Sequence, residues 1–235
     1  MILHLSSFSP PLFKATGEAQ MREAIRLGMS KAEAYGFDRR GPVQLYLEMM
    51  LLFGSHFDND PQYEWSAEIL NDREAGTEME RAEMLYKRTM HYRESVAGPE
   101  DKFTLQALRN IRIWADQPLP LSRDKFIPSM LEEIQRVYPQ KADYVGRDAL
   151  ETLIHHGGKE ALAYGFATAR AVALMIILML AFGHGCGSDP LYPWIARTLN
   201  DEAITDPAAR AKRLENKALT WLDHVLAYFD KRTQT

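Results

Sequence analysis

An internal duplication dominates this sequence. Residues 31–72 align without a gap with residues 160–201, an offset of 129, and 19 of the 42 aligned positions are identical. Ordinary composition would give about two or three identities over that length. A chain that repeats itself in this way is expected to fold as two copies of one unit that share a core.

The duplication extends beyond its best-matched part. With the same offset, weaker matches carry it to residues 17–92 and 146–221, which we call copy one and copy two. Residues 93–145 connect the copies and show no counterpart within them. The connection is too short for two independent domains on a flexible linker. We therefore expect one domain over residues 1–235, with the copies related by a pseudo-twofold axis, as in a symmetric dimer.

Helix signals occur along nearly the whole chain, and no run has the alternating pattern of a strand. Glu83 and Lys87 have the spacing of a helical ion pair. Pro42 fits the start of a helix and Gly54 its end. The sequence predicts an all-α protein of about eight to ten helices. The expected helices are 17–34, 42–53, 77–96, 101–114, 122 or 123–137, 143–156, 159–182, 190–199 and 207–229.

Charge and cysteine content argue against several classes of protein. The net charge of −4 does not favour nucleic-acid binding, which needs many Lys and Arg against phosphates. Cys186 is the only cysteine, which rules out an intramolecular disulfide and a cysteine-based zinc cage. The start of the chain lacks the pattern of a signal peptide, and the apolar run 171–182 is shorter than the roughly 20 residues that span a bilayer. We expect a cytoplasmic protein with no membrane segment and no direct contact with nucleic acid.

One motif occurs in both copies, where a helix ends and the next one begins. It consists of Phe53, Gly54, Asp60, Pro61, Tyr63 and Trp65 in copy one, and of Phe182, Gly183, Asp189, Pro190, Tyr192 and Trp194 in copy two. Asp before Pro is typical of a helix N-terminus, where the carboxylate caps backbone N–H groups. Aromatic residues in a first helical turn usually pack against a neighbouring helix. The shared part of the motif is therefore predicted to specify the fold.

A second interpretation of the same segment is an acidic rim that binds a metal or a basic partner. The rim consists of Asp58, Asp60, Glu64 and Glu68. Copy two has Gly187 and Arg197 where copy one has Asp58 and Glu68. An acidic function would then belong to copy one alone.

No catalytic, cofactor or metal site stands out. The histidines show none of the spacings of helical metal sites. Cys186 could be a nucleophile beside His184, but no family signature surrounds it, and a buried or idle cysteine is the favoured interpretation. The alternating glycines 183, 185 and 187 follow a helix and lack the Lys-Ser/Thr pair of a phosphate loop. The residues favour a binding protein rather than an enzyme.

The segment Leu51–Trp65, with its second copy, resembles a segment of small helical proteins encoded beside bacterial polymorphic toxins and type VI secretion effectors. The chain is most similar to immunity proteins of the TsiT type, whose partner toxin is a restriction-endonuclease-like nuclease. This resemblance covers about a third of the chain. It implies a cytoplasmic antitoxin that binds a cognate toxin and blocks it, and it carries over no binding residues.

We expect the partner to be met by acidic and aromatic residues around the copy-one loop, and by His184 from the loop of copy two. The candidate partner-binding residues are Phe57, Asp58, Asp60, Tyr63, Glu64, Glu68 and His184. Two alternatives stay open: an adaptor or chaperone that loads an effector onto a secretion machine, and a helical metal-dependent hydrolase using Asp60, His56, Asp189 and His184. The sequence leaves the oligomeric state open.

Overall fold

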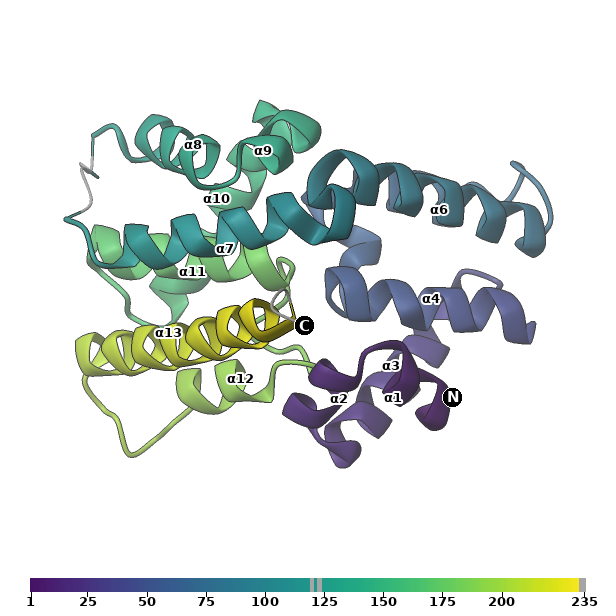
Figure 1. Ribbon diagram of the computed structural model, residues 1–235, viewed down its shortest axis with the longest axis horizontal. Coiled ribbons are helices and arrows are strands. Elements are labelled where there is room, and N and C mark those ends of the chain that lie inside the picture. Colours follow the sequence, from purple (N-terminus) through teal and green to yellow (C-terminus); the bar gives the residue numbers. More distant parts are fainter. Residues whose placement is uncertain (119–120, 122–123, 233–235) are drawn as a thin grey trace. The chain divides into compact units, whose positions relative to one another are not determined.

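The structure is a computed structural model that describes residues 1–118, 121 and 124–232 (Figure 1). All regular elements of this part of the chain are helical, which confirms the all-α class. The α-helices exceed the eight to ten that were predicted. They are α1 (Ile2–Phe8), α2 (Pro10–Thr16), α3 (Glu18–Ala34), α4 (Arg40–Phe53), α5 (Glu64–Asn71), α6 (Glu78–Tyr92), α7 (Lys102–Ala115), α8 (Phe126–Val137), α9 (Pro139–Val145), α10 (Arg147–Ala163), α11 (Ala169–Phe182), α12 (Pro193–Leu199) and α13 (Pro207–Arg232).

The chain forms two compact units, each drawn from two stretches of sequence. The first unit contains residues 1–90 and 178–197, and the second contains residues 91–177 and 198–235. The first therefore holds α1 to α5, and the second holds α7 to α10 and α13. Three helices, α6, α11 and α12, run from one unit into the other.

The helix bounds recur with the offset of the sequence duplication. α2 starts at Pro10 and α9 at Pro139, and the pairs α3 and α10, and α4 and α11, match in both start and end with the same offset. α6 and α13 start at Glu78 and Pro207, again 129 residues apart. The correspondence includes residues 10–16 and 139–145, which lie outside the copies as the sequence defined them.

Glycines explain two differences between the predicted and observed helices. The single helix expected over residues 159–182 is wrong, because α10 ends at Ala163 and Gly165 then has a φ of +77°. Gly146, with a φ of +84°, separates α9 from α10 inside the helix expected over 143–156. A positive φ is unfavourable for other residues and interrupts the helix. The start expected at residue 122 or 123 lies outside the described residues.

Each copy contains a close helix crossing at a glycine. In the first unit, a Cβ on Gly28 of α3 would lie 2.4 Å from Leu47 Cδ2 of α4. In the second unit, a Cβ on Gly157 of α10 would lie 2.6 Å from Ile176 Cγ1 of α11. The four residues occupy matching positions of the two copies. Glycine at these points lets the paired helices approach closely.

The neighbouring glycines of α10 give a paired stability prediction. Gly157→Ala should lower the free energy of unfolding by about 1–3 kcal/mol, because its new methyl group overpacks the crossing. Gly158→Ala should raise it by about 0.5–1 kcal/mol, because nothing lies within 4 Å of its Cβ and alanine favours helix. Urea titrations of both variants measure the difference. Equal changes in the two would show that α10 and α11 do not cross at Gly157.

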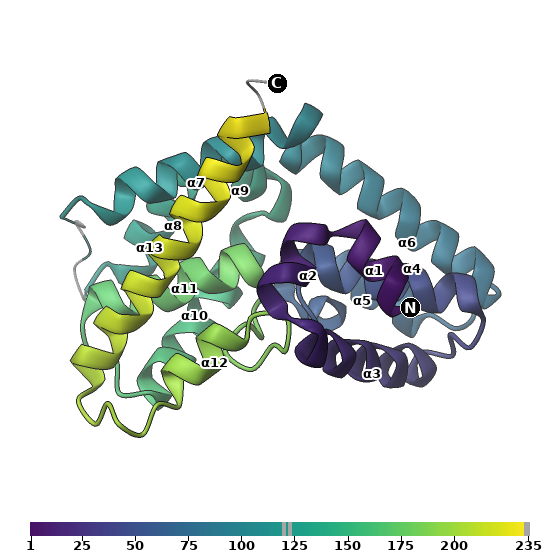
Figure 2. The ribbon, with the colours of Figure 1, turned by 60° about the horizontal axis from the view of Figure 1, so that its bottom comes forward.

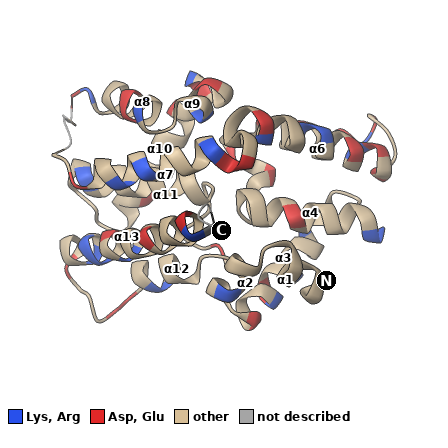
Figure 3. Cartoon of the chain, viewed as in Figure 1, with Lys and Arg blue, Asp and Glu red and all other residues tan. Residues whose placement is uncertain are grey.

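In the second unit, α7 and α13 run side by side (Figure 2). Arg109 pairs with Asp230 and Arg112 with Asp223, both at 2.8 Å. Figure 3 shows Lys and Arg on α7 and residues of both charges on α13. All four side chains are substantially exposed, so each pair contributes little more than about 1 kcal/mol.

None of the described helices is long and apolar enough to cross a bilayer. The most apolar of them, α11, covers only Ala169–Phe182.

Candidate functional site

The two copies of the motif form two loops that lie in the first unit. The first loop, residues 54–60, follows α4, and the second loop, residues 183–189, follows α11. Each loop starts with a glycine that has a φ of +93°. This left-handed conformation ends the helix and is readily reached only by glycine. The predicted role of Gly54 as a helix stop is confirmed.

The two loops pack directly against each other at these glycines. A Cβ on Gly54 would lie 2.3 Å from the carbonyl oxygen of Phe182. A Cβ on Gly183 would lie 2.7 Å from the carbonyl oxygen of Phe53. Any side chain at either position would therefore collide with backbone of the other copy. The glycines serve both the turn and the contact between the loops.

Two buried aspartates hold the loops together by reciprocal hydrogen bonds. Asp60 Oδ2 accepts from the backbone N–H of His184 at 2.6 Å. Asp189 Oδ2 accepts from the backbone N–H of Ser55 at 2.7 Å, and its Oδ1 accepts from the Ser55 hydroxyl at 2.6 Å. Ser55 and His184 occupy matching positions in the two copies. Each aspartate therefore binds the start of the opposite loop.

The same aspartates also cap their own chain segments. Asp60 Oδ1 accepts from the backbone N–H of Gln62 at 2.9 Å, and Asp189 Oδ1 from that of Leu191 at 2.8 Å. The predicted capping role is confirmed. Each carboxylate is at least 98% buried and lies among N–H and O–H donors. Hydrogen bonds to such a charge are about twice as strong as neutral ones.

The aromatic residues of the motif pack in the same way in both copies. Phe53 contacts Tyr63 and Trp65, as Phe182 contacts Tyr192 and Trp194. The ring centroids lie 4.6 and 6.1 Å apart in copy one, and 4.5 and 6.0 Å apart in copy two. The predicted packing role is confirmed.

Copy one adds a polar cluster beneath the first loop. Lys31 Nζ of α3 donates to Asp58 Oδ1 at 2.8 Å and to the carbonyl oxygen of Ser55 at 3.2 Å. The hydroxyl of Tyr35 donates to Asp58 Oδ2 at 3.1 Å, and Lys31 Nζ lies 3.3 Å from His56 Nδ1. Asp58 is 5% exposed, so these donors neutralise and solvate a buried carboxylate. The first loop is thereby tied to α3.

The pKa values of the cluster follow from burial and from these charges. Burial, and then the charge and hydrogen bond of Asp58, raise the pKa of Tyr35 to about 12. Burial, followed by the charge of Asp58, also raises the pKa of Tyr46 far above its ordinary range. Burial and the neighbouring Lys31 lower the pKa of His56. The tyrosines stay protonated and His56 stays neutral at pH 7, so His56 Nδ1 can accept from the Lys31 ammonium.

The lowered pKa of His56 predicts a pH dependence of stability. Between about pH 5 and 7 the unfolded chain binds the His56 proton more tightly than the folded chain does, so stability is lost as the pH falls. His56→Gln should reduce this loss. His155→Gln, at an exposed position of α10, is the matched control and should leave it unchanged. Urea titrations at several pH values measure the loss of stability in each variant. Equal pH dependence in both variants would contradict the buried, neutral state of His56.

The polar cluster has no equivalent in copy two. The positions that match Lys31, Tyr35, Tyr46, His56 and Asp58 hold Glu160, Tyr164, Met175, Gly185 and Gly187. Only the tyrosine is retained. Sequence reasoning did not select Lys31, Tyr35 or Tyr46, although the differences at two of these positions were a usable signal.

A histidine from each loop lies near the contact between the loops. The rings of His56 and His184 meet edge to face, with centroids 6.1 Å apart. Gly185 leaves room for this arrangement, because a Cβ there would lie 2.5 Å from His56 Cδ2. His184 Nδ1 lies 3.3 Å from Asp60 Oδ2. Both histidines are partly exposed, so they form the accessible side of an otherwise buried contact.

Most candidate partner-binding residues are not at the surface. Four are at least 95% buried: Phe57, Asp58, Asp60 and Tyr63. The rings of Phe57 and Tyr46 pack in a tilted arrangement with centroids 4.8 Å apart, and both aspartates accept hydrogen bonds within the unit. These four side chains cannot contact a partner without rearrangement of the loop. The exposed or half-buried candidates are Glu64, Glu68 and His184.

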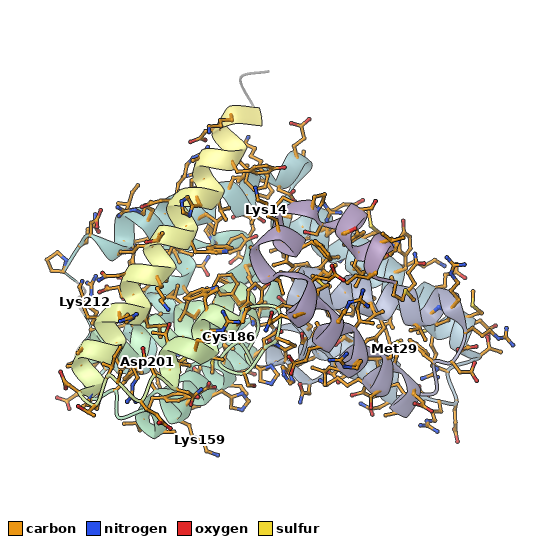
Figure 4. The ribbon with its side chains drawn as sticks, turned by 90° about the horizontal axis from the view of Figure 1, so that it is seen from below. Lys14, Met29, Lys159, Cys186, Asp201 and Lys212 are labelled. Carbon is orange, nitrogen blue, oxygen red and sulfur yellow. The ribbon has the colours of Figure 1, made fainter. Side chains whose placement is uncertain are left out.

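Cys186 lies in the second loop, between α11 and α12 (Figure 4). Its side chain is fully buried, which confirms the interpretation as a buried loop cysteine. The matching position in the first loop holds Phe57, which is also fully buried. Both side chains therefore fill the interior beneath their loops.

The described residues contain no group of three His, Cys, Asp or Glu side chains that could hold a metal ion. His56, Asp60, His184 and Asp189 lie near one another, but both carboxylates are already engaged with backbone N–H groups.

Comparison with known proteins gives no relative. The chain matches no protein family, no curated protein and no solved structure.

Proposed function

We propose that this chain is an antitoxin, an immunity protein that binds a cognate toxin by direct contact and neutralises it in the cytoplasm. The observation that carries the proposal is an exposed acidic surface on α5 of copy one. We call it the α5 surface, and define it by Glu64 and Glu68. Both carboxylates are exposed, and neither has an ion-pair or hydrogen-bond partner among the described residues.

Folding alone does not account for these two charges. Glu64 and Glu68 are four residues apart on one helix, where like charges repel and weaken the helix slightly. The matching positions of copy two hold Pro193 and Arg197. Exposed Asp72 extends the acidity past the end of α5. A surface that is acidic in one copy and not in the other suits an asymmetric role in binding.

The chemistry of the α5 surface suits a partner with exposed Lys or Arg. A nuclease toxin has such residues where it contacts nucleic-acid phosphates. Complementary charge raises the association rate more than it raises the affinity. The α5 surface would thereby compete with the toxin's substrate for the same basic residues.

A charge reversal tests this assignment. Glu64→Lys with Glu68→Lys should slow association with the proposed cognate toxin by roughly tenfold or more at low salt. The matched control, Asp148→Lys with Glu202→Lys, makes the same change in net charge at exposed positions elsewhere. Surface plasmon resonance at low and high salt measures the rates. Equal slowing in both double variants would exclude a specific role for the α5 surface.

We also infer that the two copies are homologous structural repeats related by a pseudo-twofold axis between the two loops. Support comes from the helix bounds that recur with an offset of 129 residues. Further support comes from the reciprocal hydrogen bonds of Asp60 and Asp189. Each aspartate accepts from a backbone N–H group at the start of the opposite loop. In this view the shared residues hold the repeats together, and the residues unique to copy one serve recognition.

A further inference from the structure

One flank of α6 carries exposed apolar side chains in a row. Met79, Tyr86 and Met90 are seven and four residues apart, which places them on one face of the helix. Met79 is 48% exposed, Tyr86 is 53% exposed and Met90 is partly exposed. We call these three residues the α6 stripe. Single exposed apolar residues are common, but a row of them along a helix is typical of a surface that binds protein.

Copy two shows what lies against the same face of its matching helix. Tyr86 of α6 matches Glu215 of α13, which is 9% exposed. Arg170 pairs with Glu215 and also donates to the carbonyl oxygen of Ala115, the last residue of α7. The end of α7 therefore lies beside the position that matches the middle of the α6 stripe.

From this point α7 runs antiparallel along α13. Arg112 of α7 pairs with Asp223 of α13. Arg109, about one turn earlier in α7, pairs with Asp230, about two turns later in α13. Both aspartates lie on the same face of α13 as Glu215. An antiparallel helix is thus the element that fits this face, and α7 belongs to the connection, which has no counterpart in copy one.

The charges beside the α6 stripe suit a second α6 in the antiparallel direction. Glu83 lies in the first half of α6 and Lys87 in the second half. They pair with each other at 2.7 Å, but both are more than 60% exposed, so this pair is weak and both charges can contact a second helix. In an antiparallel pair of α6 helices, Glu83 of each chain faces Lys87 of the other, and Met79 of each chain lies beside Met90 of the other. A parallel pair would instead bring like charges together.

We propose that the α6 stripe is the interface of a homodimer, in which two copies of the chain pack their α6 helices antiparallel about a twofold axis. Such an axis requires a surface that is complementary to itself, and the stripe with its flanking charges meets this requirement. One helix from each chain forms a small interface, and small interfaces give weak association that depends on concentration. This inference does not rest on the α5 surface or on the antitoxin proposal.

Sedimentation velocity of the full-length protein over a series of concentrations tests the proposal. The wild type is compared with Tyr86→Glu, which places a charge in the middle of the stripe, and with Leu162→Glu as the control. Leu162 of α10 is 67% exposed, so the control makes the same kind of change on another helix. Glu83→Lys, Lys87→Glu and the double exchange test the ion pairs. Circular dichroism checks the fold of each variant, and Tyr86→Ala replaces Tyr86→Glu if the latter does not fold.

We expect the sedimentation coefficient of the wild type to rise with concentration from that of a monomer toward that of a dimer. Tyr86→Glu should raise the dissociation constant of the dimer by about tenfold or more, and Leu162→Glu should leave it unchanged. Each single charge change should weaken the dimer. The double exchange should restore it, because the facing charges are again opposite.

Three results would each overturn the proposal. The first is a wild type that stays monomeric at every concentration, which would leave the α6 stripe to a different partner. The second is a dimer that Tyr86→Glu weakens no more than Leu162→Glu does, which would place the interface elsewhere. The third is a double exchange that weakens the dimer as much as the single changes, which would exclude the antiparallel arrangement.

Discussion

Asp189→Ala should lower the free energy of unfolding by about 3–5 kcal/mol, because it removes the acceptor of three buried hydrogen bonds. The carboxylate is 1% exposed and accepts three hydrogen bonds, two from Ser55 and one from the backbone of Leu191. Alanine leaves these donors buried without an acceptor, and each such group costs about 1–3 kcal/mol. Urea denaturation followed by circular dichroism measures the change.

Asp206 provides the matched control. It caps α13 by accepting from the backbone N–H groups of Ala208 and Ala209, but it is exposed. Asp206→Ala should cost only about 1 kcal/mol, the usual value of a helix cap. Similar losses in the two variants would mean that Asp189 acts as an ordinary cap, and that the bonds to Ser55 contribute little.

Gly54→Ala should lower the free energy of unfolding by about 2–6 kcal/mol. A residue with a Cβ pays about 1–3 kcal/mol for the conformation of Gly54, which has a φ of +93° and a ψ of 158°. The new methyl group would also lie 2.3 Å from the carbonyl oxygen of Phe182, and relief of such overpacking costs about 1–3 kcal/mol more. Thermal and urea unfolding measure the loss.

Gly146→Ala separates these two contributions. Gly146 has a φ of +84°, close to that of Gly54, but a Cβ added at Gly146 would have no other atom within 4 Å. We expect a loss of about 1–3 kcal/mol from the backbone conformation alone. If Gly54→Ala costs no more than Gly146→Ala, the two loops do not touch as closely as the structure places them.

The features predicted correctly from the sequence depend on short-range chemistry. Gly54 ends a helix because of its own conformational freedom, and Asp60 caps the segment that Pro61 begins. Such signals lie within a few residues of their effect. The all-α class followed from them and from helical periodicity.

Features that depend on distant parts of the chain could not be predicted in the same way. Asp58 was expected at a binding surface because acidic loop residues are usually exposed. It is buried because Lys31 and Tyr35, more than 20 residues earlier, reach it from α3. The bond from Asp189 to Ser55 spans 134 residues, and nothing local in either segment indicates it.

The underestimated number of helices has a physical cause as well. α1, α2 and α9 have seven residues each, too short to show two turns of helical periodicity. The pair Pro10-Pro11 also resembles a loop, although Pro10 starts α2, where its missing N–H costs little. The matching prolines Pro10 and Pro139 were a signal that the duplication reaches further than its sequence identities.

The difference between the shared residues and those found only in copy one connects the structure to the proposed function. The motif residues that the copies share are largely buried, and the motif's glycines and aspartates bind one loop to the other. Copy one alone has the Lys31–Asp58 pair under its loop and the carboxylates of the α5 surface. The antitoxin proposal therefore assigns partner recognition to copy one. The shared motif only stabilises the fold.

Growth rescue tests the antitoxin proposal most directly. Cells express the isolated catalytic domain of the proposed cognate toxin, together with the wild type, with Glu64→Lys/Glu68→Lys, or with the Asp148→Lys/Glu202→Lys control. We expect growth with the wild type and with the control, and loss of rescue with the α5-surface variant. An adaptor would not protect cells from the catalytic domain alone, so failure of the wild-type chain to restore growth would contradict the proposal.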